Sequence, residues 1–385
     1  MPEALIIDAV RTPIGKRGRA LRDMHPVDLL GQHIAALLAR TGVDPAAIDD
    51  VIAGCVGQSG EQAANIARNA WLAAGLPESV PATTIDRQCG SSLQAIHFAA
   101  QGVMAGVYDL VIAAGVESMT RVPIGASLLA GPGTPLSPGL ATRYRLEGGW
   151  FDQARGAEWI AREWGFTRED LDRYSLRSHH LAASAHAAGR FTTEIIPVLL
   201  RDGAHFDADE GIRPDTSADQ LAALKPAFPG LDLITAGNAS QISDSAAATL
   251  IASPFAVQAL GLRPRARFVA FAVVGVDPVT MLTGPIPATR RVLERAGLQA
   301  GDIDLFEVNE AFAPVVLAWQ REIGAPWERV NVNGGAIALG HPLGATGARI
   351  MATLLHELER RGGRYGLIAI CEGGGMANAT IIERV

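Results

Sequence analysis

The chain has 385 residues, of which 48% are hydrophobic and 19% are charged, and its formal net charge at pH 7 is −7. This length predicts two or three packed units, and the composition excludes a disordered or fibrous chain. The acidic balance argues against nucleic-acid binding.

Short apolar runs alternate with helical patterns from the start of the chain to its end. In chain order we expect a strand at 4–9, a helix at 26–40, a strand at 50–53, a helix at 93–104, strands at 110–114 and 268–274, helices at 287–296 and 348–360, and a strand at 367–371. Strands that alternate with helices predict an α/β fold, in which helices cover both faces of parallel or mixed sheets.

Two stretches of the sequence recur after nearly the same number of residues. Residues 47–52 resemble residues 302–306, and residues 108–113 resemble residues 365–370. Self-similarity at a constant separation indicates a duplicated unit. We therefore expect two related halves, each rich in βαβ units.

These features divide the chain into three parts. The N-terminal half covers 1–118 and is completed by about 240–265, and the C-terminal half covers 266–385. Between them, residues 119–239 combine a Gly/Pro-rich stretch with amphipathic helical patterns. Because long loops commonly cover sites that are built on a rigid scaffold, we expect this part to be a loop subdomain over the active site.

The cysteines and the start of the chain indicate a compartment. Three widely spaced cysteines, Cys55, Cys89 and Cys371, do not form a disulfide framework and favour a reducing environment. Residues 1–8 lack the features of a signal peptide, and no apolar run is long enough for membrane insertion. We expect a cytoplasmic protein, in which Cys55 is structural.

Cys89 is the strongest candidate for chemistry. Small residues and then a helical apolar pattern follow it, which predicts a helix N-terminus. Unpaired N–H groups and the helix dipole at such a position favour an anion, so we expect a thiol that is biased toward thiolate. A buried structural cysteine is the alternative. In the second half, His341 and Gly344 precede the corresponding helix, so two helix N-termini are expected to converge.

Three further segments supply the other groups that acyl transfer needs. His341, between Gly340 and Pro342, is suited to accept the proton of a thiol. Asn309 and the N–H groups of Cys89 and Gly373 are candidate donors to an oxyanion. Cys371 follows a predicted strand and is suited to act as an acid or base, with a strand-end core residue as the alternative. No spacing suggests metal ligands, and we expect His179, His180 and His186 to be surface histidines.

Four motifs occur together in the order Cys-Gly-Ser-Ser, Asn-Glu-Ala-Phe, Gly-His-Pro-Leu-Gly-Ala-Thr-Gly and Cys-Glu-Gly-Gly-Gly. With them the chain closely resembles the thiolases, from residue 4 to the C-terminus. The resemblance implies a five-layered α-β-α-β-α fold and a homodimer or homotetramer. It also implies a 3-ketoacyl-CoA thiolase, which cleaves 3-oxoacyl-CoA with CoA to acetyl-CoA and a shortened acyl-CoA.

The resemblance implies a role for each motif residue. Cys89 resembles the nucleophile that accepts the acyl group, His341 resembles its base, and Cys371 resembles the acid and base at the α-carbon of acetyl-CoA. His341 and a water held by Asn309 resemble one oxyanion hole. The N–H groups of Cys89 and Gly373 resemble the second.

Further positions are implied to meet coenzyme A, which is a substrate here and not a bound cofactor. Ser240 resembles the serine at the pantetheine arm, and Arg213 falls near the adenine-nucleotide end. Gln153 stands where short-chain biosynthetic relatives usually carry Met, and Met376 replaces a smaller or polar residue. With the Gly/Pro-rich loop at 128–140, these differences favour a degradative enzyme for longer or bulkier acyl chains.

Other functions compete with this one. A biosynthetic acetoacetyl-CoA thiolase would use the same residues in the condensing direction. A ketoacyl synthase would carry His or Glu in place of Cys371. A non-catalytic acyl-CoA- or lipid-binding protein would have lost the nucleophile or the Asn-Glu-Ala-Phe motif. A cysteine hydrolase using Cys89, His341 and Asn309 would release a free acid without any dependence on CoA.

Overall fold

A computed structural model of the protein describes residues 3–129, 132–146 and 149–385. A mixed sheet of ten strands runs through it in the order β10-β11-β12-β9-β1-β8-β5-β3-β4, with β2 attached to β8. Their bounds are β1 (Leu5–Arg11), β2 (Gly15–Lys16), β3 (Asp50–Gly54), β4 (Ala82–Ile85), β5 (Leu110–Ser118), β8 (Ser243–Ala252), β9 (Ala266–Gly275), β10 (Leu305–Val308), β11 (Tyr365–Glu372) and β12 (Met376–Arg384). Two short strands, β6 (Val198–Leu199) and β7 (His205–Phe206), form a separate pair.

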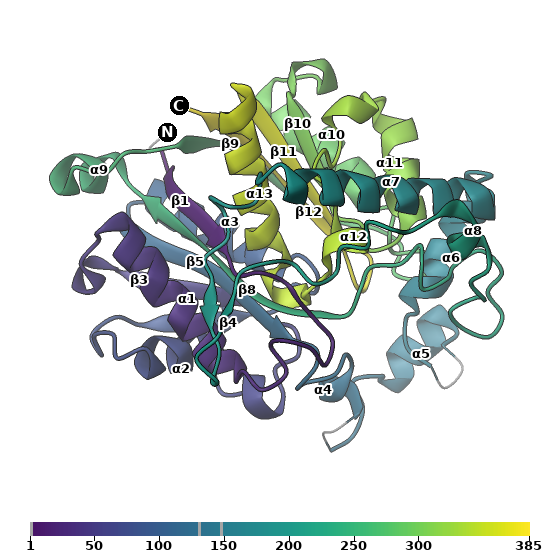
Figure 1. Ribbon diagram of the computed structural model, residues 1–385, viewed down its shortest axis with the longest axis horizontal. Coiled ribbons are helices and arrows are strands. Elements are labelled where there is room, and N and C mark those ends of the chain that lie inside the picture. Colours follow the sequence, from purple (N-terminus) through teal and green to yellow (C-terminus); the bar gives the residue numbers. More distant parts are fainter. Residues whose placement is uncertain (1–2, 130–131, 147–148) are drawn as a thin grey trace.

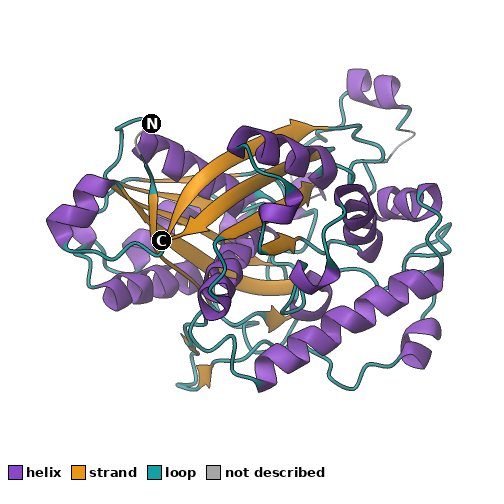
Figure 2. Cartoon of the chain, turned by 90° about the horizontal axis from the view of Figure 1, so that it is seen from above, coloured by secondary structure: helices purple, strands orange, loops and turns teal. Residues whose placement is uncertain are grey.

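The sheet has two parts, one with the strands β1, β8, β5, β3 and β4 and the other with β9, β12, β11 and β10. Helices on both faces of each part complete five layers, as the motifs imply (Figure 2). α1 (Pro26–Thr41) and α2 (Ile66–Ala73) pack outside the part from β1 to β4. α3 (Ser91–Met104) and α13 (Thr346–Arg361) lie between the two parts, at the centre of Figure 1. α10 (Pro285–Ala296) and α11 (Ala313–Ile323) pack outside the part from β9 to β10.

The alternation of side chains along each central strand explains this layering. In β5, Val111 belongs to the core around α3 and α13, whereas Ile112 belongs to the core around α1. Successive side chains of a strand point to opposite faces, so an unbroken apolar run needs cover on both. The same alternation in β11 places Ile370 in the inner core and Cys371 in the outer core beside α10 and α11.

The strands and helices expected from the apolar patterns are all present, with ends that differ by a few residues. The patterns do not predict β8 or β12, which are rich in small residues. β8 pairs with both β1 and β5, and β12 pairs with both β11 and β9. Their backbone hydrogen bonds to two neighbours therefore define them as strands more than their own composition does.

The segment between β5 and β8 carries α4 (Ala126–Leu129), α5 (Pro138–Tyr144), α6 (Gln153–Glu163), α7 (Arg168–Ala187) and α8 (Ala218–Ala222). Residues 130–131 of the loop expected at 128–140, and residues 147–148, lie outside the described residues. The Asp152 carboxylate accepts hydrogen bonds from the N–H groups of Ala154 and Arg155, at 2.9 Å and 3.2 Å. This N-cap fixes the start of α6 and therefore the position of Gln153.

No helix in the described ranges combines the length and the apolar character that a membrane crossing needs.

Candidate active site

Cys89 lies in a tight turn directly before α3 and is only 2% exposed. The Ser91 hydroxyl accepts a hydrogen bond from the Arg87 N–H at 2.9 Å and donates one to the Gln88 carbonyl at 2.6 Å. Gln88 adopts a φ of 48°, a left-handed conformation that residues other than glycine seldom adopt. The two serine hydrogen bonds hold this strained turn and so fix the sulfur at the start of the helix.

The surroundings of the Cys89 sulfur favour the neutral thiol. Burial and the nearby Glu372 raise the pKa of Cys89 to about 12. Hydrogen bonding by the Gln153 side chain and by the N–H groups of Cys89 and Gly373 lowers that pKa, but by less. The expectation of a thiolate from the helix N-terminus alone is therefore wrong, because desolvation outweighs the helix dipole. A base has to remove the proton.

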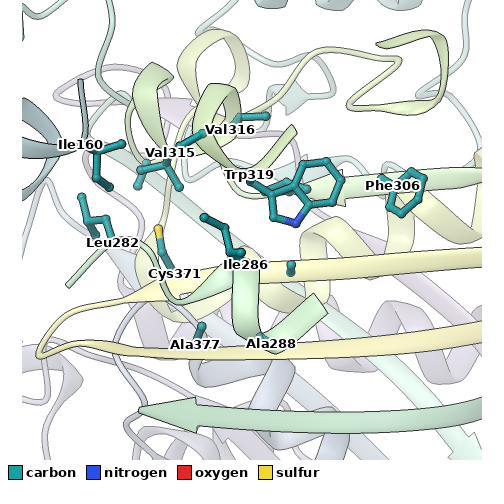
Figure 3. Close-up of a cluster of buried hydrophobic side chains, with 14 of the residues drawn as sticks. Ile160, Leu282, Ile286, Ala288, Phe306, Val315, Val316, Trp319, Cys371 and Ala377 are labelled. Carbon is teal, nitrogen blue, oxygen red and sulfur yellow. The ribbon is translucent and has the colours of Figure 1, made fainter. Parts of the chain in front are cut away.

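Cys371 lies at the carboxyl end of β11 and is fully buried. Figure 3 shows its sulfur among the apolar side chains of Leu282, Ile286 and Val315. Burial is the main cause that raises the pKa of Cys371 well above that of an ordinary thiol, and the proximity of Cys89 and Glu372 raises it further. The structure thus brings the two predicted sulfur atoms close enough to interact, in surroundings that keep both protonated.

Asn309 and Cys371 lie at the same edge of the sheet. β10 and β11 are parallel, with Val308 opposite Ala369, so the residues that follow emerge side by side. The Asn309 N–H donates to the Ala369 carbonyl at 3.0 Å and continues this pairing by one residue. Asn309 is buried, and its Oδ1 has no hydrogen-bond partner among the described residues. A buried acceptor without a partner is a position that a bound water or a substrate group would occupy.

His341 is buried next to Asn309, whose Nδ2 lies 3.3 Å from the ring Nε2. The ring Nδ1 lies 2.7 Å from the hydroxyl of Thr346, and that hydroxyl donates to the Pro342 carbonyl at 2.8 Å. Because the single hydroxyl proton is used on Pro342, the Thr346 oxygen has to accept from Nδ1–H. The proton of the ring is therefore on Nδ1, and Nε2 carries the lone pair of a base.

The charge state of His341 supports the same role. Burial, with a smaller contribution from the Arg349 guanidinium, lowers the pKa of His341 to about 3. The imidazole is therefore neutral at physiological pH. Burial makes this neutral ring a weak base, and a negative charge that develops beside it raises its affinity for a proton.

Two buried carboxylates hold the loop that carries His341. Glu117, at the end of β5, accepts from the Gly344 N–H at 2.9 Å, and Glu310 accepts from the Ile337 N–H at 3.1 Å, in α12 (Ala336–Leu339). Each carboxylate satisfies N–H groups that no helix or strand partner reaches. The loop position is therefore set by residues distant in sequence.

The two helix N-termini meet, as the duplicated pattern predicts. The Ala348 N–H, in the first turn of α13, donates to the Ser92 hydroxyl of α3 at 3.0 Å. A Cβ on Gly347 would overlap the backbone of Leu93, so only glycine permits this close approach. The two helices that begin near Cys89 and His341 are thus held against each other.

Of the positions implied to meet coenzyme A, Arg213 lines a cavity of about 130 Å³. It is lined by His179, Arg213, Gln241 and Ile337 among others, and Ser240 directly precedes Gln241. The Gln241 carbonyl accepts from the His341 N–H at 3.0 Å, which connects this cavity with the catalytic loop. The arrangement suits a ligand that reaches from the surface at Arg213 toward His341.

Three other predicted positions have clear locations. His179 is buried and its Nδ1 accepts from the Arg213 N–H at 3.3 Å, so the expectation of a surface histidine is wrong for it, whereas His180 and His186 are exposed. Met376, half-buried, contacts Arg87 Nη1 through its sulfur at 3.7 Å. Cys55 is buried 4.0 Å from Glu117, where burial raises the pKa of its thiol.

The sequence motifs do not indicate a functional role for Thr346, Glu117 or Glu372. Thr346 lies inside the quoted glycine-histidine motif, and a hydroxyl at the start of the following helix is a signal that could have identified it. Glu117 contacts Gly344 across 227 residues of chain, which no local pattern records. Glu372 directly follows Cys371, and its burial appears only in the folded chain.

Comparisons with known proteins agree with this geometry. Family models described as thiolase, N-terminal domain, and thiolase, C-terminal domain, match residues 4–254 and 262–384. The chain is 54% identical to a steroid 3-ketoacyl-CoA thiolase, FadA6, of Mycobacterium tuberculosis, over 100% of this chain and 95% of that protein. It is 46% identical to a 3-oxoadipyl-CoA/3-oxo-5,6-dehydrosuberyl-CoA thiolase of Escherichia coli, over 100% of both.

The crystal structure of the Bacillus anthracis acetyl-CoA acetyltransferase superposes with a TM-score of 0.92 at 41% identity, and the match covers 100% of this chain and 99% of that one. This likeness confirms the fold that the motifs imply. By its family domains, its relatives and its architecture, the chain belongs to the thiolase family.

Proposed function

We propose that the protein is a degradative 3-ketoacyl-CoA thiolase, which transfers the acyl group of a 3-oxoacyl-CoA to CoA and releases acetyl-CoA. One observation supports this function: two thiols, Cys89 and Cys371, are both buried, and Cys89 is near enough to contribute to the raised pKa of Cys371. A hydrolase needs one nucleophile. Carbon–carbon cleavage needs a second acid, because the departing acetyl-CoA enolate has to be protonated.

In the first half-reaction Cys89 attacks the 3-keto carbon of the substrate while its proton moves to His341 Nε2. The proton transfer accompanies C–S bond formation, since a thiol with a pKa of about 12 does not accumulate as thiolate. The C2–C3 bond then breaks and its electron pair passes to the acetyl-CoA enolate. Cys371 gives its proton to C2, which leaves acetyl-CoA and an acyl thioester on Cys89.

The second half-reaction restores both protons. The sulfur of free CoA attacks the acyl thioester, and the proton of CoA returns to Cys371. The protonated His341 gives its proton back to the Cys89 sulfur as that sulfur leaves. The cycle balances with acyl-CoA and CoA as the only reactants, and no step passes through a metal or a bound cofactor.

Two groups of donors stabilise the developing negative charge. The N–H groups of Cys89 and Gly373 face the nucleophilic sulfur and form the hole for the tetrahedral oxyanion. His341, with a water held by the neighbouring Asn309, is proposed to form the hole for the thioester or enolate oxygen. Each donor of this kind contributes roughly 3 kcal/mol to transition-state stabilisation.

Coenzyme A is proposed to lie along the cavity beside Gln241, with Ser240 at the pantetheine arm and Arg213 near the nucleotide. Arg213 is exposed and lines this cavity, and a guanidinium is suited to bind a phosphate. The path from Arg213 to His341 through Gln241 supports this orientation.

The acyl group is proposed to be long or bulky. Gln153 takes the position beside the nucleophile, and Phe151, two residues earlier, makes edge contacts with Tyr144 and Trp150, with ring centroids 5.4 Å and 5.6 Å apart. Aromatic surface close to the acyl position favours a large apolar group. The similarity to a thiolase named for steroid substrates supports a ring-bearing acyl-CoA. Met376, beside Arg87, is proposed as part of the same wall.

We also propose a cytoplasmic homodimer or homotetramer. β4 is an edge strand of the sheet, and Phe98 of α3 is 43% exposed. An open strand edge and an exposed aromatic side chain are features that a second copy would cover. The three free cysteines support a reducing compartment.

Thiolysis of a panel of 3-oxoacyl-CoAs, from acetoacetyl-CoA to long-chain and steroid-derived thioesters, tests the reaction and its substrate. The expected result is CoA-dependent release of acetyl-CoA, with the highest kcat/KM for the bulkier substrates. Cys89→Ala is expected to abolish turnover while it still binds CoA. Release of free acid without CoA would identify a hydrolase, and preference for condensation to acetoacetyl-CoA would identify a biosynthetic enzyme.

A further inference from the structure

Glu372 is a buried acid that the mechanism above leaves unused. It directly follows Cys371 at the end of β11 and is fully buried. Neither of its carboxylate oxygens has a hydrogen-bond partner among the residues that the structure describes. Burying an ionised carboxylate without hydrogen bonds costs a large free energy, whereas burying a neutral carboxylic acid costs far less.

The side chain of Asn378 lies beside this acid. A Cβ on Gly90 would overlap Glu372 Oε1 and would also lie 2.7 Å from Asn378 Nδ2 and 2.8 Å from Asn378 Oδ1, so these groups surround one point. Asn378 Nδ2 donates to the Gly90 carbonyl at 2.9 Å, while Asn378 Oδ1 is unpaired among the described residues. The amide therefore presents a free acceptor where the acid needs one.

We propose that Glu372 is a positioning residue that stays a neutral carboxylic acid, donates its O–H to Asn378 Oδ1, and thereby leaves Cys89 and Cys371 to carry the negative charge of the site. The chain Glu372–Asn378–Gly90 then ends one residue from the nucleophile. It both anchors the turn and keeps a competing charge away from the sulfur atoms. This proposal rests on the function proposed above for the two thiols.

The charged and titratable neighbours of Glu372 are consistent with the neutral form. Burial raises the pKa of Glu372 to about 9, with Asp86 raising it further and Arg87 lowering it. Burial likewise raises the pKa of Asp86. On α3, burial lowers the pKa of His97 to about 3, so that ring is neutral. Arg87 is the positive group here, and its Nε is itself buried and unpaired among the described residues.

Ionisation of Glu372 should therefore suppress the thiols. Its negative charge contributes to the raised pKa of both Cys89 and Cys371. Below pH 9 the acid is neutral and this contribution is absent. Above pH 9 it ionises, and its negative charge then makes the formation of a nearby thiolate less favourable. The alkylation rate of Cys89 should thus rise less steeply with pH above 9 than the thiol alone would allow.

The test is the pH dependence of iodoacetamide alkylation at Cys89, followed by mass spectrometry on the full-length protein. For the unmodified protein we expect the rate to rise with pH and to flatten near pH 9, well below the pKa of the thiol. At pH 7 we expect Glu372→Gln to be alkylated at nearly the same rate as the unmodified protein. Above pH 10 the alkylation rate of Glu372→Gln should exceed that of the unmodified protein by about 10-fold, the effect of one pK unit on the thiolate fraction.

Glu383→Gln is the matched control, because Glu383 lies at the opposite end of the same β11–β12 hairpin and is paired with Arg364 and Arg267. It should reproduce the unmodified profile. Circular dichroism at each pH verifies that the proteins remain folded. Faster alkylation of Glu372→Gln already at pH 7 would mean that Glu372 is ionised there, and a constant ratio at every pH would mean a purely structural role. Either result overturns the proposal.

The profile of the unmodified protein decides the question even if Glu372→Gln does not fold, since the absence of a break near pH 9 also refutes it. Alkylation needs no acyl-CoA. Its outcome therefore separates this proposal from the proposed function, which the thiolysis panel tests by itself.

Discussion

Thr346 offers the sharpest test of how the fold prepares the catalytic base. Its hydroxyl accepts from His341 Nδ1–H at 2.7 Å and donates to the Pro342 carbonyl at 2.8 Å. In Thr346→Val the shape is kept, but the Nδ1–H loses its acceptor inside a fully buried site. An unpaired buried donor costs about 1–3 kcal/mol. The imidazole avoids this cost when its proton moves from Nδ1 to Nε2, and the protonated Nε2 can then no longer act as a base.

The expected result is a fall in kcat for thiolysis of about 5- to 150-fold, the range that 1–3 kcal/mol corresponds to. KM for the acyl-CoA should change little, because Thr346 touches the histidine and not the ligand. Thr346→Ser keeps the hydroxyl and should retain most of the activity. Steady-state kinetics on both variants, with thermal melts to verify folding, makes the comparison. A Val variant with kcat within two-fold of the unmodified enzyme would refute the tautomer argument.

Two further predictions follow from the buried groups. Cys371→Ala should still form the acyl-enzyme from an acyl-CoA, because Cys89 and His341 are intact. Exchange of the acetyl-CoA α-protons with deuterated solvent, measured by NMR, should fall by about 10²-fold or more, the usual contribution of a general acid or base. Normal exchange would remove Cys371 from this role. His97 is fully buried, burial lowers its pKa to about 3, and neither ring nitrogen has a partner among the described residues. Its folded pKa lies below the unfolded value of about 6.5, so its contribution to stability is present above pH 6.5 and is lost as the pH falls toward 3. In denaturant unfolding, His97→Leu should therefore lose about 2 kcal/mol less than the unmodified protein between pH 7 and pH 5; parallel curves for the two proteins would contradict this.

The apolar patterns predict the central strands and helices because these elements are buried on both sides. An unbroken apolar run such as that of β5 has one stable location, between two layers of helices. β8 and β12 escape prediction for the opposite reason. Their small residues fit where two neighbouring strands already supply the hydrogen-bonding partners, and those partners are distant in sequence.

His179 and His180 show what periodicity leaves open. Both lie on α7, and helical spacing places them on different faces. The pattern does not tell which face another segment covers. In the folded chain, His179 is covered by the segment that carries Arg213, and His180 faces solvent.

The sequence by itself determines which residues are candidates for the chemistry. Cys89, His341, Asn309 and Cys371 lie in motifs whose glycines and helix starts are local properties, so the resemblance of these motifs to those of the thiolases is sufficient to single them out as candidates. Only the tertiary structure decides the protonation states. Burial of the two thiols, the hydroxyl beside His341 Nδ1 and the burial of Glu372 arise from segments that meet across the whole chain. Desolvation, which is the largest cause of each pKa shift, exists only once those segments have packed together.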